Sequence, residues 1–159
     1  MLDFLRHPAL LDCIEELVGV EIIGSSVYRV RPKVPAYDRG EVPWHQDSGY
    51  LLAHCDKDLM VTCWIPLVDA TRDNGCLYVI PGVLLMTNLT PHASFANKTN
   101  IIRWSVDLRY HSFDVPHNVD EAPESYTPER DPVTMACHPA EADFIIRYPQ
   151  DTSREVTHV

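Results

Sequence analysis

A histidine and an aspartate separated by one residue are the first feature of this sequence that points to chemistry. His45 and Asp47 stand in the segment WHQDSGYLL. In a β-strand, residues i and i+2 lie on the same face, so this spacing offers a metal ion two ligands along one edge. The pair alone is weak evidence, because His45 can equally be a hydrogen-bonded histidine beside a solvated Asp47.

A third ligand must come from another part of the chain. The best candidate is His92, which follows the apolar segment VLLMTNL. Two histidines and one carboxylate form the facial triad that holds Fe(II) and leaves adjacent coordination positions for a chelating co-substrate and dioxygen. The sequence therefore predicts an iron site made of three residues.

Arg103 begins the alternating segment that follows His92. In IIRWSVDLRY one face is apolar, and the other face carries Arg103, Ser105, Asp107 and Arg109. A guanidinium directed into a barrel interior needs an anionic partner to offset its desolvation. A co-substrate carboxylate bound through two hydrogen bonds would be such a partner. The alternative is a solvent-facing Arg103 on a half-exposed strand.

Three sequence blocks, in this order, resemble the signatures of the phytanoyl-CoA dioxygenase family: WHQDSGYLL, TCWIPLVDATRDNGCLYVIPG and PHASFANKTNIIR. The resemblance covers residues 25–110 and implies a mainly β fold, the double-stranded β-helix or jelly roll of cupin-like proteins. It also implies an oxidoreductase, a dioxygenase that uses Fe(II) with 2-oxoglutarate and O2 as co-substrates and hydroxylates a small organic or acyl-type substrate.

The same resemblance implies roles for individual residues. Metal binding and catalysis fall to three of them, His45, Asp47 and His92. Arg103 is expected to anchor 2-oxoglutarate, and Ser94 to hydrogen-bond one of its carboxylates. Trp64 is expected to form a wall of the co-substrate pocket, and Gln46 to lie in or behind that pocket. As alternatives, Trp64 is a core aromatic residue and Ser94 a turn hydroxyl.

The sequence departs from the family pattern at one junction. Family members place a long segment between the VIPG block and the strand that carries the distal histidine, whereas here Gly82 is followed directly by VLLMTNLTPHAS. This leaves open whether the shortened chain assembles an active site. One alternative is therefore a catalytically impaired relative that acts as a binding or oligomerisation module. Another is a cupin-like metal protein that needs no 2-oxoglutarate, although the position of Arg103 argues against it.

The elements that must position these residues follow from hydrophobic periodicity. Apolar residues at helical spacing between Pro8 and Gly19 predict a short amino-terminal amphipathic helix. Strands are expected at residues 20–32, 59–66, 76–81, 83–89 and 101–110. The turn residues Asp73, Asn74 and Gly75 predict a hairpin that joins the strands on either side of them.

One domain, residues 1–159, is expected, with a β-helix core at 20–110 and a Pro-rich carboxy-terminal extension at 111–159. Six of the 13 prolines fall within residues 116–149, which argues against a continuous core element there. The formal charge of −10 disfavours nucleic acid and anionic membranes as partners, and no targeting segment is evident. We expect a cytoplasmic protein with a small-molecule substrate. The substrate itself and the oligomeric state are not specified.

Overall fold

The computed structural model describes residues 1–159 except 27, 37–39, 48–57, 80–85, 116–142 and 158–159. Two helices come first, α1 (Leu2–Leu5) and α2 (Pro8–Val18). A larger antiparallel sheet contains β1 (Ile22–Gly24), β2 (Arg29–Lys33), β4 (Val61–Pro66), β7 (Arg103–Ser112) and β8 (Phe144–Arg147). A smaller antiparallel sheet contains β3 (Val42–His45), β5 (Leu77–Val79) and β6 (His92–Ser94). A 3-10 helix, η5 (Thr152–Arg154), follows β8.

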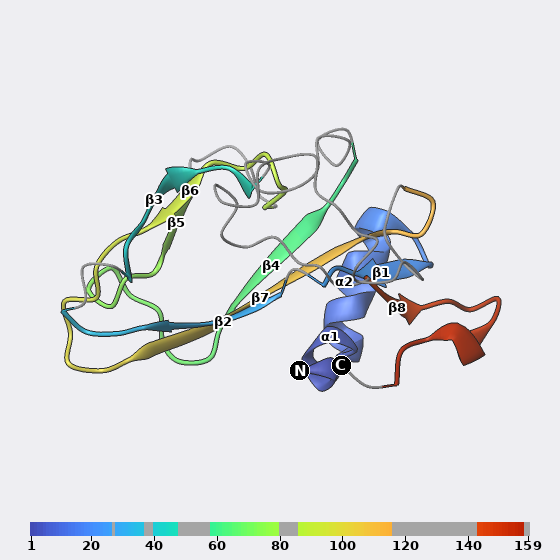
Figure 1. Ribbon diagram of the computed structural model, residues 1–159, viewed down its shortest axis with the longest axis horizontal. Coiled ribbons are helices and arrows are strands. Elements are labelled where there is room, and N and C mark those ends of the chain that lie inside the picture. The colour runs from blue at the N-terminus through green and yellow to red at the C-terminus, as the bar shows by residue number, and fades with distance from the viewer. Residues whose placement is uncertain (27, 37–39, 48–57, 80–85, 116–142, 158–159) are drawn as a thin grey trace, which may run out of the picture.

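Strand β7 is the centre of the larger sheet. Its residues 103–107 pair with β2, residues 105–110 with β4, and residues 110–112 with β1. Figure 1 shows the small sheet of β3, β5 and β6 on one side of the long strands β2, β4 and β7, with the helices at the other end of the molecule. The site described below lies between these two sheets.

The apolar face of β7 forms the core with helix α2. Leu11 and Ile14 of the helix are buried against Val106, Leu108 and Tyr110, as alternation along 101–110 predicts. The predicted helix is confirmed: Pro8 is its first residue, and Gly19 ends it at φ +91°, a conformation that favours glycine. Helix and strand together hold the larger sheet rigid beneath the cavity.

The predicted hairpin at Asp73, Asn74 and Gly75 is wrong in its strand pairing. A turn does form there, closed by the Asn74 side-chain amide, which donates to the Asp69 carbonyl at 2.7 Å. The two flanking strands do not pair with each other, because β4 pairs with β7 and β5 pairs with β6. The turn therefore carries the chain from one sheet to the other.

Two other strand predictions need correction. Residues 20–32 form two short strands, β1 and β2, on different parts of β7, because the chain turns between them. Of the strand expected at 83–89, residues 83–85 lie outside the described ranges. The remainder makes only an isolated bridge, in which Thr87 pairs with Val61, before a turn.

The expectation that the chain after Tyr110 adds no core element is wrong for one short segment. Strand β8 pairs with β1, and its Ile145 and Ile146 are 5% and 1% exposed. A strand of four residues is long enough to join the core here, because Ile145 and Ile146 are apolar and β8 adds to a sheet that already exists. The domain division at residue 110 itself stays a prediction. No helix within the described ranges has the length and hydropathy needed to cross a bilayer.

Candidate metal and co-substrate site

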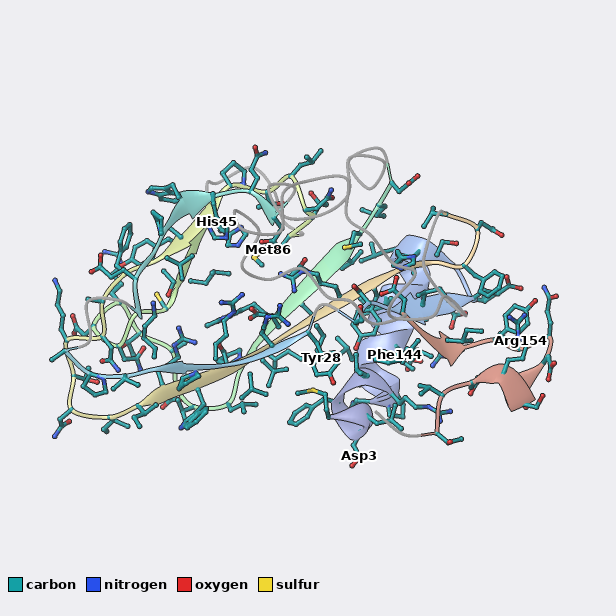
Figure 2. All side chains as sticks on the ribbon, viewed as in Figure 1. Asp3, Tyr28, His45, Met86, Phe144 and Arg154 are labelled. Atoms are coloured by element: carbon teal, nitrogen blue, oxygen red, sulfur yellow. The ribbon has the colours of Figure 1, made fainter. Side chains whose placement is uncertain are left out.

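The two histidines predicted as ligands face each other across a strand pair. His45 is the last residue of β3, His92 is the first residue of β6, and the antiparallel register places them opposite one another. Their ring centroids are 4.2 Å apart. Figure 2 shows His45 pointing from β3 into the space between the sheets, near Met86.

Asp47 completes the cluster, although β3 ends before it. Its Oδ1 lies 3.6 Å from His45 Nε2 and 3.5 Å from His92 Nε2. One potential ligand atom from each of the three residues lies within 4.8 Å of the others. A divalent cation between these atoms would have three protein ligands on one side. The structure thus brings together all three residues that the sequence suggested.

Both imidazoles are oriented by backbone carbonyls two residues earlier. The Nδ1–H of His45 donates to the Pro43 carbonyl at 2.8 Å, and that of His92 donates to the Thr90 carbonyl at 2.9 Å. This tautomer leaves each Nε2 with a free lone pair, which is the arrangement that metal-binding histidines adopt. Asp47, which would accept a hydrogen bond from a protonated Nε2, raises the pKa of His45, while partial burial opposes this effect.

Arg109 holds the carboxylate of Asp47 from the opposite side. Its Nη2 donates to Asp47 Oδ2 at 2.7 Å and its Nε to the same oxygen at 3.3 Å. Both side chains are only 2% exposed. Because Oδ2 is occupied, Oδ1 is the oxygen that faces the two histidines. The sequence placed Arg109 on the polar face of its strand, but nothing in the sequence indicated this ion pair.

A cavity of about 340 Å³ lies between the sheets and includes the three ligands in its wall. Its floor is the polar face of β2, β4 and β7. Among the described residues, five basic ones line it: Arg29, Arg31, Lys33, Arg103 and Arg109. Three acidic ones line it: Glu41, Asp47 and Asp107. This described part of the wall therefore carries an excess of positive charge, although the whole chain has a formal charge of −10.

Arg103 is directed into this cavity rather than into solvent, with 3% of its surface exposed. Its Nη1 donates to Ser105 Oγ at 2.6 Å and its Nη2 to the Gly75 carbonyl at 2.8 Å. The guanidinium lies 5.2 Å from the centre of the Trp64 ring, and burial lowers the pKa of Arg103. Its Nε has no hydrogen-bond partner among the described residues. A buried donor of this kind fits an anionic ligand.

Residues 3–83 match the phytanoyl-CoA dioxygenase (PhyH) family. The chain belongs to this family. A protein from Oryza sativa subsp. japonica, phytanoyl-CoA dioxygenase 1, is 46% identical over 43 residues, which are 27% of this chain and 15% of that protein. The chain thus spans a small part of the curated relative.

Solved structures of non-haem enzymes share the fold. The apo form of the non-haem monooxygenase ThoJ superposes with a TM-score of 0.62 at 22% identity, over 72% of this chain and 55% of that one. SnoN, a non-haem α-ketoglutarate-dependent epimerase from nogalamycin biosynthesis, gives a TM-score of 0.56 at 18% identity, over 69% and 55%. The mainly β jelly-roll fold expected from the sequence is confirmed.

The remaining residues that the PhyH resemblance singled out lie in different places. Ser94 is buried in the cavity wall, and its Oγ donates to the Gly75 carbonyl at 2.9 Å, the same oxygen that Arg103 contacts. Trp64 also lines the cavity. Gln46 is exposed, its amide donates to the Leu89 carbonyl, and it is not part of the cavity wall. A pocket role for Gln46 stays a prediction.

Lys33 is a cavity residue that the sequence did not single out. It pairs with Arg103 across β2 and β7 and is 5% exposed. Its Nζ donates to the carbonyls of Ser94, at 3.1 Å, and Gly40. Burial, together with the positive charge of Arg103, lowers the pKa of Lys33 to about 8. Two cations side by side strengthen the preference of this end of the cavity for an anion.

Proposed function

We propose that this chain is an Fe(II)- and 2-oxoglutarate-dependent dioxygenase that hydroxylates a small organic substrate. The buried Arg103, with an unpartnered Nε in a cavity that also contains the His45, Asp47 and His92 cluster, carries the proposal. Membership of the PhyH family supports it, as does the dependence of the structural neighbour SnoN on α-ketoglutarate.

The donor set suits Fe(II). Two neutral imidazoles and one carboxylate are the ligands of the facial triad, and that triad leaves coordination positions for a chelating keto acid and dioxygen. His45 and His92 would bind through Nε2 and Asp47 through Oδ1. Arg109 pairs with Oδ2 of Asp47 and so fixes which oxygen is presented. When bound, Fe(II) with 2-oxoglutarate and O2 supplies an oxidant for an unactivated C–H bond, and 2-oxoglutarate becomes succinate and CO2.

The Arg103 end of the cavity suits the distal carboxylate of 2-oxoglutarate. Ser94 and His92 lie two residues apart on β6, about 7 Å along a strand, and Arg103 meets Ser94 at the Gly75 carbonyl. A five-carbon dicarboxylate has a comparable length. Arg103 Nε and Lys33 Nζ would bind the distal carboxylate, and Trp64 would cover the guanidinium and exclude water. Ser94 would hydrogen-bond the carboxylate by turning its hydroxyl from the Gly75 carbonyl, which keeps its hydrogen bond from Arg103.

The experiment is an anaerobic titration of the metal-free protein with Fe(II) and then with 2-oxoglutarate. Chelation of the keto acid to Fe(II) produces a weak visible charge-transfer band. The band is expected in the native protein and is expected to be lost in His92→Ala, which removes one ligand. Fe(II) binding without the band would refute a working oxygenase and would favour the binding-module alternative.

A second measurement separates hydroxylation from epimerisation, the reaction of SnoN. Compounds are screened for stimulated succinate formation, and the product that accompanies the succinate is weighed by mass spectrometry. Gain of one oxygen atom supports hydroxylation. Succinate formation with a product of unchanged mass and inverted stereochemistry would replace hydroxylation by epimerisation.

A further inference from the structure

Three buried side-chain atoms have no hydrogen-bond partner among the described residues, and all belong to the cavity. They are Thr62 Oγ1, Arg103 Nε and Asp107 Oδ1. Thr62 is 7% exposed and Asp107 6% exposed. Buried polar atoms in native proteins are nearly always hydrogen-bonded, so unpartnered atoms that share one cavity point to a ligand.

Asp107 and Thr62 are neighbours on the cavity floor. Asp107 pairs with Trp64 across β7 and β4, and Thr62 pairs with Arg109, so Thr62 and Asp107 are diagonal positions on one face. Arg31 occupies the other carboxylate oxygen of Asp107. One carboxylate oxygen and one hydroxyl therefore lack a partner among the described residues, at neighbouring positions of this face.

The co-substrate cannot satisfy Asp107. An ionised carboxylate only accepts hydrogen bonds, and 2-oxoglutarate at neutral pH has no O–H or N–H to donate. Arg103 Nε, in contrast, is a donor that a carboxylate of the co-substrate can satisfy. The donor facing Asp107 therefore comes from another molecule, an ordered water or the hydroxyl or ammonium group of a substrate that displaces it, with Thr62 as a further donor or acceptor.

Charge decides between a hydroxyl and an ammonium group as that donor. Arg31 already balances the charge of Asp107, and the part of the cavity wall that the structure describes holds five basic residues against three acidic ones. Fe(II) and the 2-oxoglutarate dianion cancel each other, so these described residues leave an excess of two positive charges. An ammonium group would be repelled by this excess, whereas a neutral hydroxyl would not.

We propose that Asp107 and Thr62 form a subsite for a hydroxyl group of the primary substrate, which is therefore a neutral hydroxylated compound rather than an amine. The inference rests on the proposed function for the position of 2-oxoglutarate. It narrows the substrate class from small organic or acyl-type compounds to alcohols and polyols.

Three small probes of one shape test the subsite: cyclohexanol, fluorocyclohexane, which lacks the donor, and cyclohexylamine, which carries the cation. Their affinities are measured by saturation-transfer NMR on protein loaded with diamagnetic Zn(II) and 2-oxoglutarate. Cyclohexanol is expected to bind about tenfold more tightly than fluorocyclohexane, because the fluoro compound leaves a buried carboxylate oxygen unpaired. Cyclohexylamine is expected to bind more weakly than cyclohexanol.

Substitutions test whether Asp107 and Thr62 cause the preference for cyclohexanol over fluorocyclohexane. Asp107→Leu is expected to abolish the advantage of cyclohexanol, and Thr62→Val, which is isosteric, is expected to reduce it. Glu41→Gln removes a different carboxylate of the cavity wall, one whose Oε1 accepts from the Ala96 amide, and is expected to retain the advantage. Thermal melts show which variants are folded, and Thr62→Val keeps the test decisive if Asp107→Leu does not fold.

The proposed subsite is refuted if cyclohexanol binds the native protein no more tightly than fluorocyclohexane, or if no probe binds. It is also refuted if the higher affinity for cyclohexanol survives in folded Asp107→Leu and Thr62→Val variants. Tightest binding of cyclohexylamine would overturn the choice of a neutral hydroxyl. The Fe(II) and 2-oxoglutarate titration is read separately. Absence of the charge-transfer band together with a preference for cyclohexanol would refute the proposed function and leave the subsite intact.

Discussion

Replacement of Arg103 by methionine is the sharpest test of the co-substrate end of the cavity. The side chain makes two hydrogen bonds, to Ser105 Oγ and the Gly75 carbonyl, and its Nε has no hydrogen-bond partner among the described residues. Methionine has a similar length and no charge. Loss of a charge-assisted contact costs about 1.5–3 kcal/mol of binding free energy, so the Kd of 2-oxoglutarate should rise about 10- to 100-fold.

Stability and metal binding should respond differently from co-substrate binding. Gly75 keeps its hydrogen bond from Ser94, and removal of a buried cation relieves its desolvation, so the free energy of unfolding should change by no more than about 1 kcal/mol. Fe(II) affinity should stay near the native value, because Arg103 contacts none of the three ligands. The assay is the charge-transfer titration, with urea unfolding in parallel.

Arg31→Met is the matched control for Arg103→Met. Arg31 also lines the cavity, but its side chain is 41% exposed and already paired with Asp107. Its replacement should leave the Kd of 2-oxoglutarate within about threefold of the native value. If Arg103→Met binds 2-oxoglutarate as tightly as the native protein, or if both variants lose affinity equally, Arg103 is not the anchor and the reasoning is refuted.

Three further predictions concern stability. Arg109→Met leaves Asp47 buried without its cation and should lower the free energy of unfolding of the metal-free protein by about 3–5 kcal/mol in urea melts; an unchanged midpoint would contradict the buried ion pair. Ile14→Ala, at a position 2% exposed, should cost about 2–5 kcal/mol by thermal unfolding, and a loss below 1 kcal/mol would place Ile14 outside the core. The pKa of Lys33 is lowered from 10.5 to about 8, so between these pH values the unfolded chain binds more protons, and stability should rise with pH by up to about 3 kcal/mol. The Lys33→Met variant should lack this rise in stability, which urea melts at about pH 8 and pH 10.5 would show. An equal rise in the native protein and the variant would mean that another group causes the pH dependence.

Patterns that depend on neighbouring residues were readable from the sequence. Alternation along 101–110 predicted both faces of β7, including the inward direction of Arg103. The one-residue spacing of His45 and Asp47 suggested two metal ligands on one strand. His92 was the best candidate for the third ligand, and the resemblance to the family implied the same role. Each of these inferences uses periodicity or a local motif, and the structure brings the residues together as such patterns imply.

Relations between distant segments were not readable in the same way. The turn at Asp73 to Gly75 has strong local chemistry, but that chemistry does not say whether the strands on either side join one sheet or two. The partner of Asp47, Arg109, lies 62 residues away, and only the packed fold brings their charges into contact. Strand β8 is too short to show periodicity among so many prolines, and it forms because β1 offers an open edge.

The position of β7 late in the chain has a consequence for biosynthesis. Ile22, Arg29 and Val61 pair with Ser112, Asp107 and Tyr110, so β1, β2 and β4 all emerge from the ribosome long before their common partner. Until β7 is translated, these strands have exposed edges and the cavity has no floor. A nascent chain that stops before Arg103 would not fold stably, because β1, β2 and β4 would lack their common partner. It would be an aggregation-prone product that the cell's chaperones and proteases must handle.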